Sequence, residues 1–251
     1  MKNSLGQRIK IQQGWETESE RKKRVSQEKK EMQKSILYFQ KIKSPKEIKI
    51  EPSITTDQLK HLFNQEAKNF YNNLNREFIV DDTNRNFYNL ICHYFAEDVL
   101  FETKYNGELQ KGLMIFGDVG TGKSSSLEII QNISRKYNIK KLWFVITSTH
   151  NVVTEYNESK NRDGVIRYYS KGKIMFDDLG AEREASNYGK EDIFSRILEF
   201  RYEEFKHRGI KTFITTNYTL QDVKKRYGVR VYDRFKEMFN FIELDGESRR
   251  F

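Results

Sequence analysis

The chain has 251 residues, of which 37% are hydrophobic, 14% aromatic and 32% charged, a composition that argues against a wholly disordered protein and allows one or two domains. Its net charge of +9 favours polyanionic partners such as nucleic acid without identifying one, since solubility alone could also account for it. The single cysteine, Cys92, excludes an intramolecular disulfide, and no stretch approaches the roughly 18 apolar residues of a membrane helix, so we expect a soluble, cytoplasmic protein without a membrane partner.

Residues 1–77 are predicted to form a basic, mainly helical N-terminal region that contacts a protein partner or DNA. Residues 1 to about 45 are rich in Lys, Arg, Glu and Gln and contain few large apolar side chains. Such a segment buries little surface alone, so it could be a solvated helix, a disordered arm or a segment that folds on a partner. From Thr55 to Leu74 apolar side chains recur at helical spacing and predict an amphipathic helix.

Residues 78–251 are predicted to form a separate domain. A second amphipathic helix is expected after Asp81, with Phe87 to Phe95 supplying its apolar face. Strand-like and helical runs then alternate, with strands predicted at 112–116, 141–146, 173–176 and 211–215 and helices at 124–137, after Ser148 and at 193–207. Apolar strands separated by helices predict an α/β fold with a parallel sheet covered on both faces.

A phosphate-binding loop is predicted between the first strand and the next helix, where the sequence matches G-x-x-x-x-G-K-[ST] in full. Three glycines allow backbone N–H groups to point at phosphate oxygens, and the helix adds its positive N-terminus. We expect Lys123 to reach the β and γ phosphates of ATP and the Ser124 hydroxyl to bind Mg²⁺. The expected nucleotide-binding residues are Gly117, Asp118, Val119, Gly120, Thr121, Gly122, Lys123, Ser124 and Ser125.

Two aspartates follow the strand at 173–176 and supply the carboxylates that a nucleotide site needs. Asp177 is the predicted Mg²⁺ residue, because the carboxyl end of a buried parallel strand faces the edge of the sheet where ligands bind. Asp178 is predicted to polarise the attacking water, and Glu182 is a second candidate for that role. An ordinary strand end and turn is the structural alternative for these acids.

The order of these strands resembles that of the additional-strand P-loop ATPases, the AAA+ type, in which the strand at 211–215 would lie between the other two. The resemblance implies that Asn217 acts as a sensor beside the γ-phosphate; the alternative is that it caps the following helix. Tyr227 to Phe235 resembles the box before the last strand of AAA+ modules, which implies an arginine acting in a neighbouring subunit's site. Arg234 is the first candidate and Arg230 the second, against the alternative of a basic surface.

Taken together, GDVGTGKS, IMFDDLGAE, TTN and VYDRF resemble the lid-poor AAA+ branch that contains the helicase loaders DnaC and DnaI and the transposition ATPase IstB. The 34 residues after Asn217 are too few for a separate helical lid. The resemblance implies an ATPase that hydrolyses ATP weakly unless assembled, forms an ATP-dependent oligomer on DNA, preferably single-stranded, and contacts a replicative helicase. An IstB-like protein would instead assemble on duplex DNA and direct a transposase. A small-molecule kinase is the third reading, although no recognisable lid motif supports it.

Overall fold

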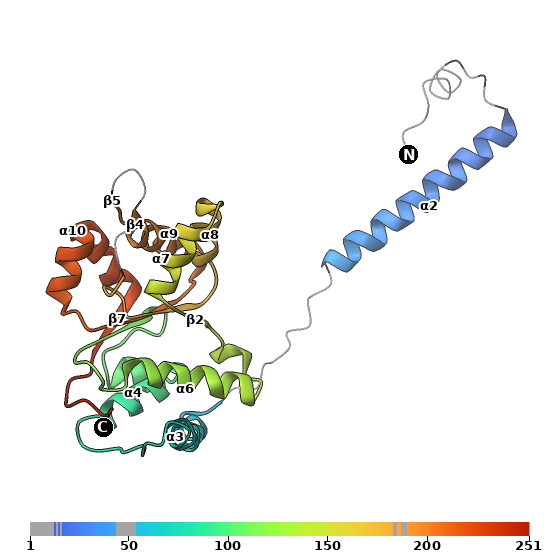
Figure 1. Cartoon of the computed structure of the whole chain (residues 1–251). Helices are drawn as coiled ribbons and strands as arrows, with labels where there is room; N and C mark the ends of the chain where they lie inside the picture. Colours follow the sequence, from blue (N-terminus) through green and yellow to red (C-terminus); the bar gives the residue numbers. More distant parts are fainter. Residues whose placement is uncertain are drawn as a thin grey trace. The chain divides into compact units, whose positions relative to one another are not determined.

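The computed structural model describes residues 13, 15, 17–43, 54–182, 185–186 and 190–250, and the chain divides into two units, Met1–Ile50 and Glu51–Phe251. The first unit contains the helix α2 (Glu18–Lys43), whose described side chains are nearly all exposed (Figure 1). Charged pairs one turn apart support it, with Lys22 Nζ lying 3.2 Å from Glu18 Oε1. The predicted helical character of this region is confirmed. No described helix is both long enough and apolar enough to cross a membrane.

The second unit is built on a five-stranded sheet in which every neighbouring pair of strands is parallel. The strand order is β2-β3-β6-β1-β7, so β6 lies between β1 and β3, as the resemblance implied. A short antiparallel pair, β4 (Ala185–Ser186) and β5 (Lys190–Glu191), stands apart from this sheet. The five strands of the sheet are β1 (Gly112–Phe116), β2 (Val145–Ser148), β3 (Ile174–Asp177), β6 (Thr212–Thr216) and β7 (Phe239–Glu243).

Helices cover both faces of the sheet, which confirms the predicted α/β architecture (Figure 1). Successive residues of a strand point to opposite faces, so Leu113 and Ile115 belong to one core and Met114 to the other. The first core is shared with α3 (Thr56–Asn72), α4 (Arg85–Phe95), α5 (Leu100–Thr103), α6 (Lys123–Lys136) and the 3-10 helix η1 (Lys140–Leu142). The second is shared with α7 (Thr149–Glu158), α8 (Arg162–Tyr169), α9 (Ile193–Arg208) and α10 (Leu220–Met238).

Helix α3 belongs to the second unit, which contains the sheet. Its predicted start is confirmed, since Thr55 caps it in a reciprocal capping box with Gln58. Its apolar face packs into the core beneath α6, and Glu66 accepts a hydrogen bond of 2.7 Å from Lys136 Nζ. The division falls between residues 50 and 51, whereas the sequence placed the boundary after residue 77. The spacing of the apolar residues in α3 predicted a helix, but it could not indicate that this helix packs into the same core as the sheet.

The second strand begins later than the apolar run had indicated. Residues 140–142 form η1, and the strand β2 covers only Val145–Ser148. Leu142 and Phe144 are buried in the core from this turn, and the Phe144 carbonyl accepts a hydrogen bond of 3.1 Å from Gln131 Nε2. The apolar run at 141–146 therefore predicted a longer strand, because Leu142 and Phe144 are buried although the first residues of the run form a 3-10 turn.

Asp98 fastens the start of α3 to the segment that follows α4. Its Oδ2 atom accepts hydrogen bonds from Thr56 Oγ1 at 2.6 Å and pairs with His93 Nδ1 at 2.9 Å. Its Oδ1 atom accepts from the Leu100 N–H at 2.9 Å. The Thr56 hydrogen bond, followed by that of Leu100, lowers the pKa of Asp98 to about 2.

Asp98→Asn should therefore remove an acid-sensitive part of the stability. Because the folded-state pKa lies below the unfolded value, the contribution of the carboxylate is complete above about pH 4 and is lost as the pH falls toward about 2. We expect a loss of about 1 kcal/mol at neutral pH and a smaller difference near pH 2, measured by urea unfolding at both pH values. The exposed Asp82→Asn is the control, and a pH-independent difference would contradict the assignment.

Candidate functional site

The loop between β1 and α6 curls through three glycines with positive φ: Gly117 at 132°, Gly120 at 85° and Gly122 at 102°. Close approach adds a second constraint at two of them. A Cβ on Gly117 would lie 2.4 Å from the Leu244 carbonyl oxygen, and one on Gly120 would lie 2.3 Å from Ser248 Oγ. Only glycine therefore permits both the turn and its contact with residues 244–248.

Lys123 lies at the first turn of α6, and its ammonium group bends back across the loop. Its Nζ donates to the Gly117 carbonyl at 2.9 Å and to the Asp118 carbonyl at 2.5 Å. Burial lowers the pKa of Lys123, while the charge of Asp178 acts to raise it. Among the described residues its hydrogen-bond acceptors are these two neutral carbonyls, which anionic phosphate oxygens in the cavity could replace.

The carboxyl ends of β6 and β3 bring polar side chains to the same edge. Thr215 connects the two acidic residues: its hydroxyl donates to Asp177 Oδ1 at 2.5 Å and accepts from the Asp178 N–H at 3.2 Å. The Asn217 amide lies 3.4 Å from Asp178 Oδ1. The helix cap at this end of the chain is Thr219, in a capping box with Asp222, so the capping alternative for Asn217 does not describe this structure.

Asp178 has an unusual backbone conformation at the edge of the cavity. Its φ of 56° lies in the left-handed region, which aspartate tolerates better than most residues, and its carbonyl accepts a hydrogen bond from Thr149 Oγ1 at 2.8 Å. Burial, followed by the charge of Asp177, raises the pKa of Asp178. A carboxylate with a raised pKa is a better proton acceptor, as a residue that polarises water must be.

These groups line one cavity of about 270 Å³. Of the residues predicted from the sequence, it is lined by Gly120, Gly122, Lys123, Ser124, Ser125, Asp177, Asp178 and Asn217. The side chains of residues 123 and 177 thus lie at the same end of the sheet. Val119 is exposed, whereas Thr121 holds the loop by donating from Oγ1 to the Asp118 carbonyl at 3.0 Å.

Five further residues line this cavity that the sequence reasoning missed: Tyr71, Arg76, Glu128, Arg249 and Arg250. Glu128 carried a signal, because it stands four residues after Ser124 and therefore on the same helical face. Burial raises the pKa of Glu128, with a further contribution from Asp177. The other four arrive through packing between distant segments, which no local pattern encodes.

Residues 244–250 follow β7 and run along the phosphate loop. The Leu244 N–H donates to the Phe116 carbonyl at 2.8 Å, and the Arg249 N–H donates to the Gly120 carbonyl at 3.0 Å. Asp81 holds the Arg249 guanidinium at 2.8 Å. The described residues after β7 form this segment rather than a helical lid, and it places the last two described arginines at the cavity.

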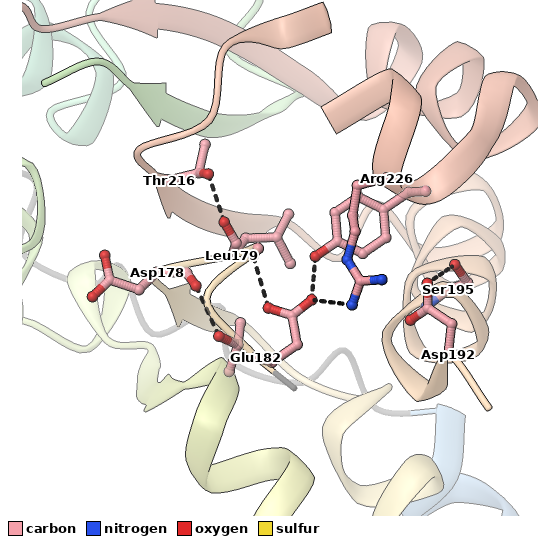
Figure 2. A network of polar contacts seen from close by, with 10 residues as sticks. Asp178, Leu179, Glu182, Asp192, Ser195, Thr216 and Arg226 are labelled. Carbon is pink, nitrogen blue, oxygen red and sulfur yellow. Dashed lines mark hydrogen bonds and ion pairs between the residues drawn. The ribbon is translucent and has the colours of Figure 1, made fainter. Parts of the chain in front are cut away.

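Glu182 lies outside the cavity, in a buried network that Figure 2 shows. One carboxylate oxygen accepts from the Gly180 N–H at 2.7 Å, and the other accepts from the Tyr227 hydroxyl and lies 4.0 Å from an Arg226 nitrogen. Thr216 adds a bond of 2.6 Å to the Leu179 carbonyl. This geometry makes Glu182 a structural link between the turn at Asp178 and α10. Of the two candidates for polarising water, Asp178 is therefore the one that lines the cavity.

Glu182→Gln should consequently lower stability more than nucleotide binding. The amide nitrogen of glutamine cannot accept from either donor, so Gly180 or Tyr227 would lose its buried acceptor. We expect a loss of about 2 to 3 kcal/mol in the free energy of unfolding, with ATP affinity of the folded protein within about two-fold of wild type. The exposed Glu158→Gln serves as the control. Loss of hydrolysis at unchanged stability would instead place Glu182 in the chemistry.

The two candidate trans arginines lie on α10, away from the cavity of their own chain. Arg234 Nη1 lies 3.0 Å from Glu199 Oε1, and its guanidinium lies over the Tyr202 ring at 4.9 Å, so its side chain is only 18% exposed. Arg230 Nε lies 3.7 Å from the same oxygen, and its side chain is 77% exposed. Gly228 interrupts the helix before them, with φ 85° and ψ 163°.

No protein-family model and no curated protein matches this chain. Solved structures similar to it include the DnaC helicase loader, at 20% identity over 66% of this chain and 93% of that chain with a TM-score of 0.46. They include DnaI, at 26% identity over 66% and 88% with a TM-score of 0.47, and AMPPCP-bound DnaA from Aquifex aeolicus, at 18% over 69% and 50% with 0.44.

Proposed function

We propose that this chain is an AAA+ ATPase of the helicase-loader type, which binds ATP and Mg²⁺ at residues 117–125 and assembles on DNA through that site. One observation carries the proposal: Lys123, Asp177, Asp178 and Asn217 line a single cavity at the carboxyl edge of β1, β6 and β3. The phosphate-binding loop follows β1, the two acids lie at the end of β3, and the polar Asn217 comes directly after β6, which lies between those strands. These are the parts that phosphoryl chemistry requires.

The donor set in the cavity fits magnesium. Ser124 and Asp177 both line the cavity and offer hard oxygen atoms, and within the described residues no group of three or more His, Cys, Asp or Glu side chains could hold a metal by itself. Ser124 and Asp177 would therefore hold Mg²⁺ together with phosphate oxygens. The ion would neutralise phosphate charge during the reaction.

Each remaining side chain has a role that follows from its position. Lys123 exchanges its two loop carbonyls for oxygens of the β and γ phosphates. Asp178 orients the attacking water and accepts its proton, and Asn217, beside the same carboxylate, donates to the γ-phosphate. Arg249 and Arg250 add positive charge at the mouth of the cavity from the chain's own last segment.

Assembly would complete the site with an arginine from a neighbouring subunit. Arg234 and Arg230 are the proposed residues, and the greater exposure of Arg230 favours it as the one that reaches across. Removing such an arginine should lower the ATPase rate of the assembled protein by about 10³-fold while leaving ATP binding by single subunits intact.

Mixing two inactive variants tests this arrangement. Lys123→Ala lacks the phosphate contact but keeps its arginines, and an Arg230→Ala, Arg234→Ala double variant lacks the arginines but keeps its phosphate loop. Neither alone should hydrolyse ATP on DNA, whereas an equimolar mixture should recover part of the activity. No recovery in assembled mixtures would reject the trans role.

DNA binding tests the remainder of the proposal. ATP-dependent binding of the wild type to single-stranded DNA, together with capture of a replicative helicase, would support the loader assignment. ATP-dependent filaments on duplex DNA would favour the IstB-like transposition ATPase instead. Binding of neither DNA form in the presence of ATP would reject both.

A further inference from the structure

A second hollow lies at the opposite end of the strands from the nucleotide cavity. We call it the edge surface, and it has a volume of about 420 Å³. It includes the start of β2 at Val145 and the start of β3 at Ile174, whereas the nucleotide cavity lies beyond the end of β3 at Asp177. Its lining residues are Lys140, Trp143, Val145, Tyr168, Lys171, Gly172, Lys173 and Ile174.

Two aromatic rings stand exposed on this surface. Trp143 is 43% exposed and Tyr168 is 63% exposed, although aromatic side chains of this size are usually covered. They come from different segments, one before β2 and one from α8, and both line the hollow at β2, the outer strand of the sheet. Exposed rings grouped in a hollow are typical of a binding surface.

The charged side chains that line the edge surface itself are all positive. Three lysines and no acidic residue line the hollow. Two more lysines, Lys141 and Lys211, line a neighbouring hollow together with Trp143 and Lys173, and the acidic Glu97 lines that hollow as well. Lys141 Nζ lies 2.6 Å from Glu97 Oε2, and Lys173 Nζ donates to the Lys141 carbonyl at 2.9 Å. The surface is therefore complementary to a polyanion.

We propose that the edge surface binds single-stranded nucleic acid, with bases stacked on Trp143 and Tyr168 and phosphates held by Lys140, Lys171 and Lys173. The inference rests on the proposed function and specifies where its DNA binds. Lysines alone would accept any polyanion, but flat rings beside them select an anion with exposed aromatic faces. Duplex DNA hides its base faces, and a polymer of aspartate or glutamate has no aromatic faces.

The chain offers its own reporter for this surface. Its two tryptophans are Trp15 and Trp143, so Trp15→Phe leaves Trp143 as the single source of tryptophan emission. Titration of that variant with an oligothymidylate of about 20 nucleotides should quench the emission to saturation, and added salt should weaken the binding. Polyglutamate of equal charge should not quench it, and equal quenching would overturn nucleic acid as the occupant.

Charge reversal separates this surface from general attraction by a basic protein. The double variant Lys140→Glu, Lys171→Glu changes two exposed lysines and should weaken oligothymidylate binding by at least about ten-fold. Lys68→Glu, Lys206→Glu makes the same charge change on other exposed positions and should weaken it far less. Tyr168→Ala should cost about ten-fold without altering charge.

The outcomes distinguish the two levels of inference. Single-strand binding by the wild type with unchanged Trp143 emission and unchanged affinity in both edge variants would overturn the edge surface and leave the proposed ATPase and its DNA binding standing. Failure of the wild type to bind any DNA would overturn both. Weaker oligothymidylate binding by both edge variants, with ATP affinity equal to that of the wild type, would support the edge surface as the nucleic-acid site.

Discussion

Lys123→Ala is expected to weaken ATP binding by about 10- to 100-fold and to abolish measurable hydrolysis. The ammonium group is the buried cation in the cavity, and its present acceptors are two carbonyls of its own loop, at 2.9 and 2.5 Å. A charge-assisted contact to phosphate contributes about 1.5 to 3 kcal/mol, which corresponds to that loss of affinity. Isothermal titration calorimetry with ATP and Mg²⁺ measures it directly.

The matched control is Lys104→Ala, which removes an exposed lysine outside the cavity. It should bind ATP as the wild type does. Stability also needs checking, because alanine at 123 leaves the Gly117 and Asp118 carbonyls without this donor. An unfolding temperature close to wild type combined with unchanged ATP affinity would remove Lys123, and the nucleotide site with it, from the assignment.

Arg201→Met is expected to destabilise the protein by about 3 to 5 kcal/mol. Arg201 is fully buried on α9, and its guanidinium donates to Thr212 Oγ1 at 2.6 Å, the Gly172 carbonyl at 2.7 Å and the Tyr169 carbonyl at 3.0 Å. Burial lowers its pKa to about 9, so the group remains charged at neutral pH. Its loss would leave several buried acceptors without a donor at the start of β6 and the end of α8.

Urea unfolding compares this variant with two others. Arg208→Met removes an exposed arginine at the end of the same helix, paired with Glu204, and should change stability by less than about 0.5 kcal/mol. Arg201→Lys should fall between them, because a single ammonium group cannot reach acceptors spread over three segments. Equal stability of the methionine variants at 201 and 208 would contradict the bracing role.

The phosphate loop could be predicted because its information is local: glycines at fixed offsets, a strand before them and a helix after them. The position of β6 between β1 and β3 followed from a resemblance in strand order and is confirmed. The start of β2 was less predictable, since Leu142 and Phe144 are buried whether the backbone is extended or turned. Burial pattern alone does not distinguish those backbones.

The composition of the cavity wall was the least predictable part. Arg249 reaches it only because residues 244–250 bond to a loop more than a hundred positions earlier, and Tyr71 reaches it only because α3 packs beneath α6. Glu182 shows the converse: its position after the two aspartates indicated chemistry, whereas its hydrogen bonds give it a bracing place. Long-range packing decides such assignments.

The bend in α10 has a consequence for how subunits could fit together. The backbone angles at Gly228 belong to a region that only glycine occupies at low energy. Before the bend, Tyr227 is anchored through Glu182 to the turn beyond β3; after it, Arg230 and Arg234 project from a new axis. One residue without a side chain thus sets the direction of the helical segment that carries both arginines, which here face Glu199, and in the proposed assembly that angle would fix where Arg230 could meet an adjoining subunit.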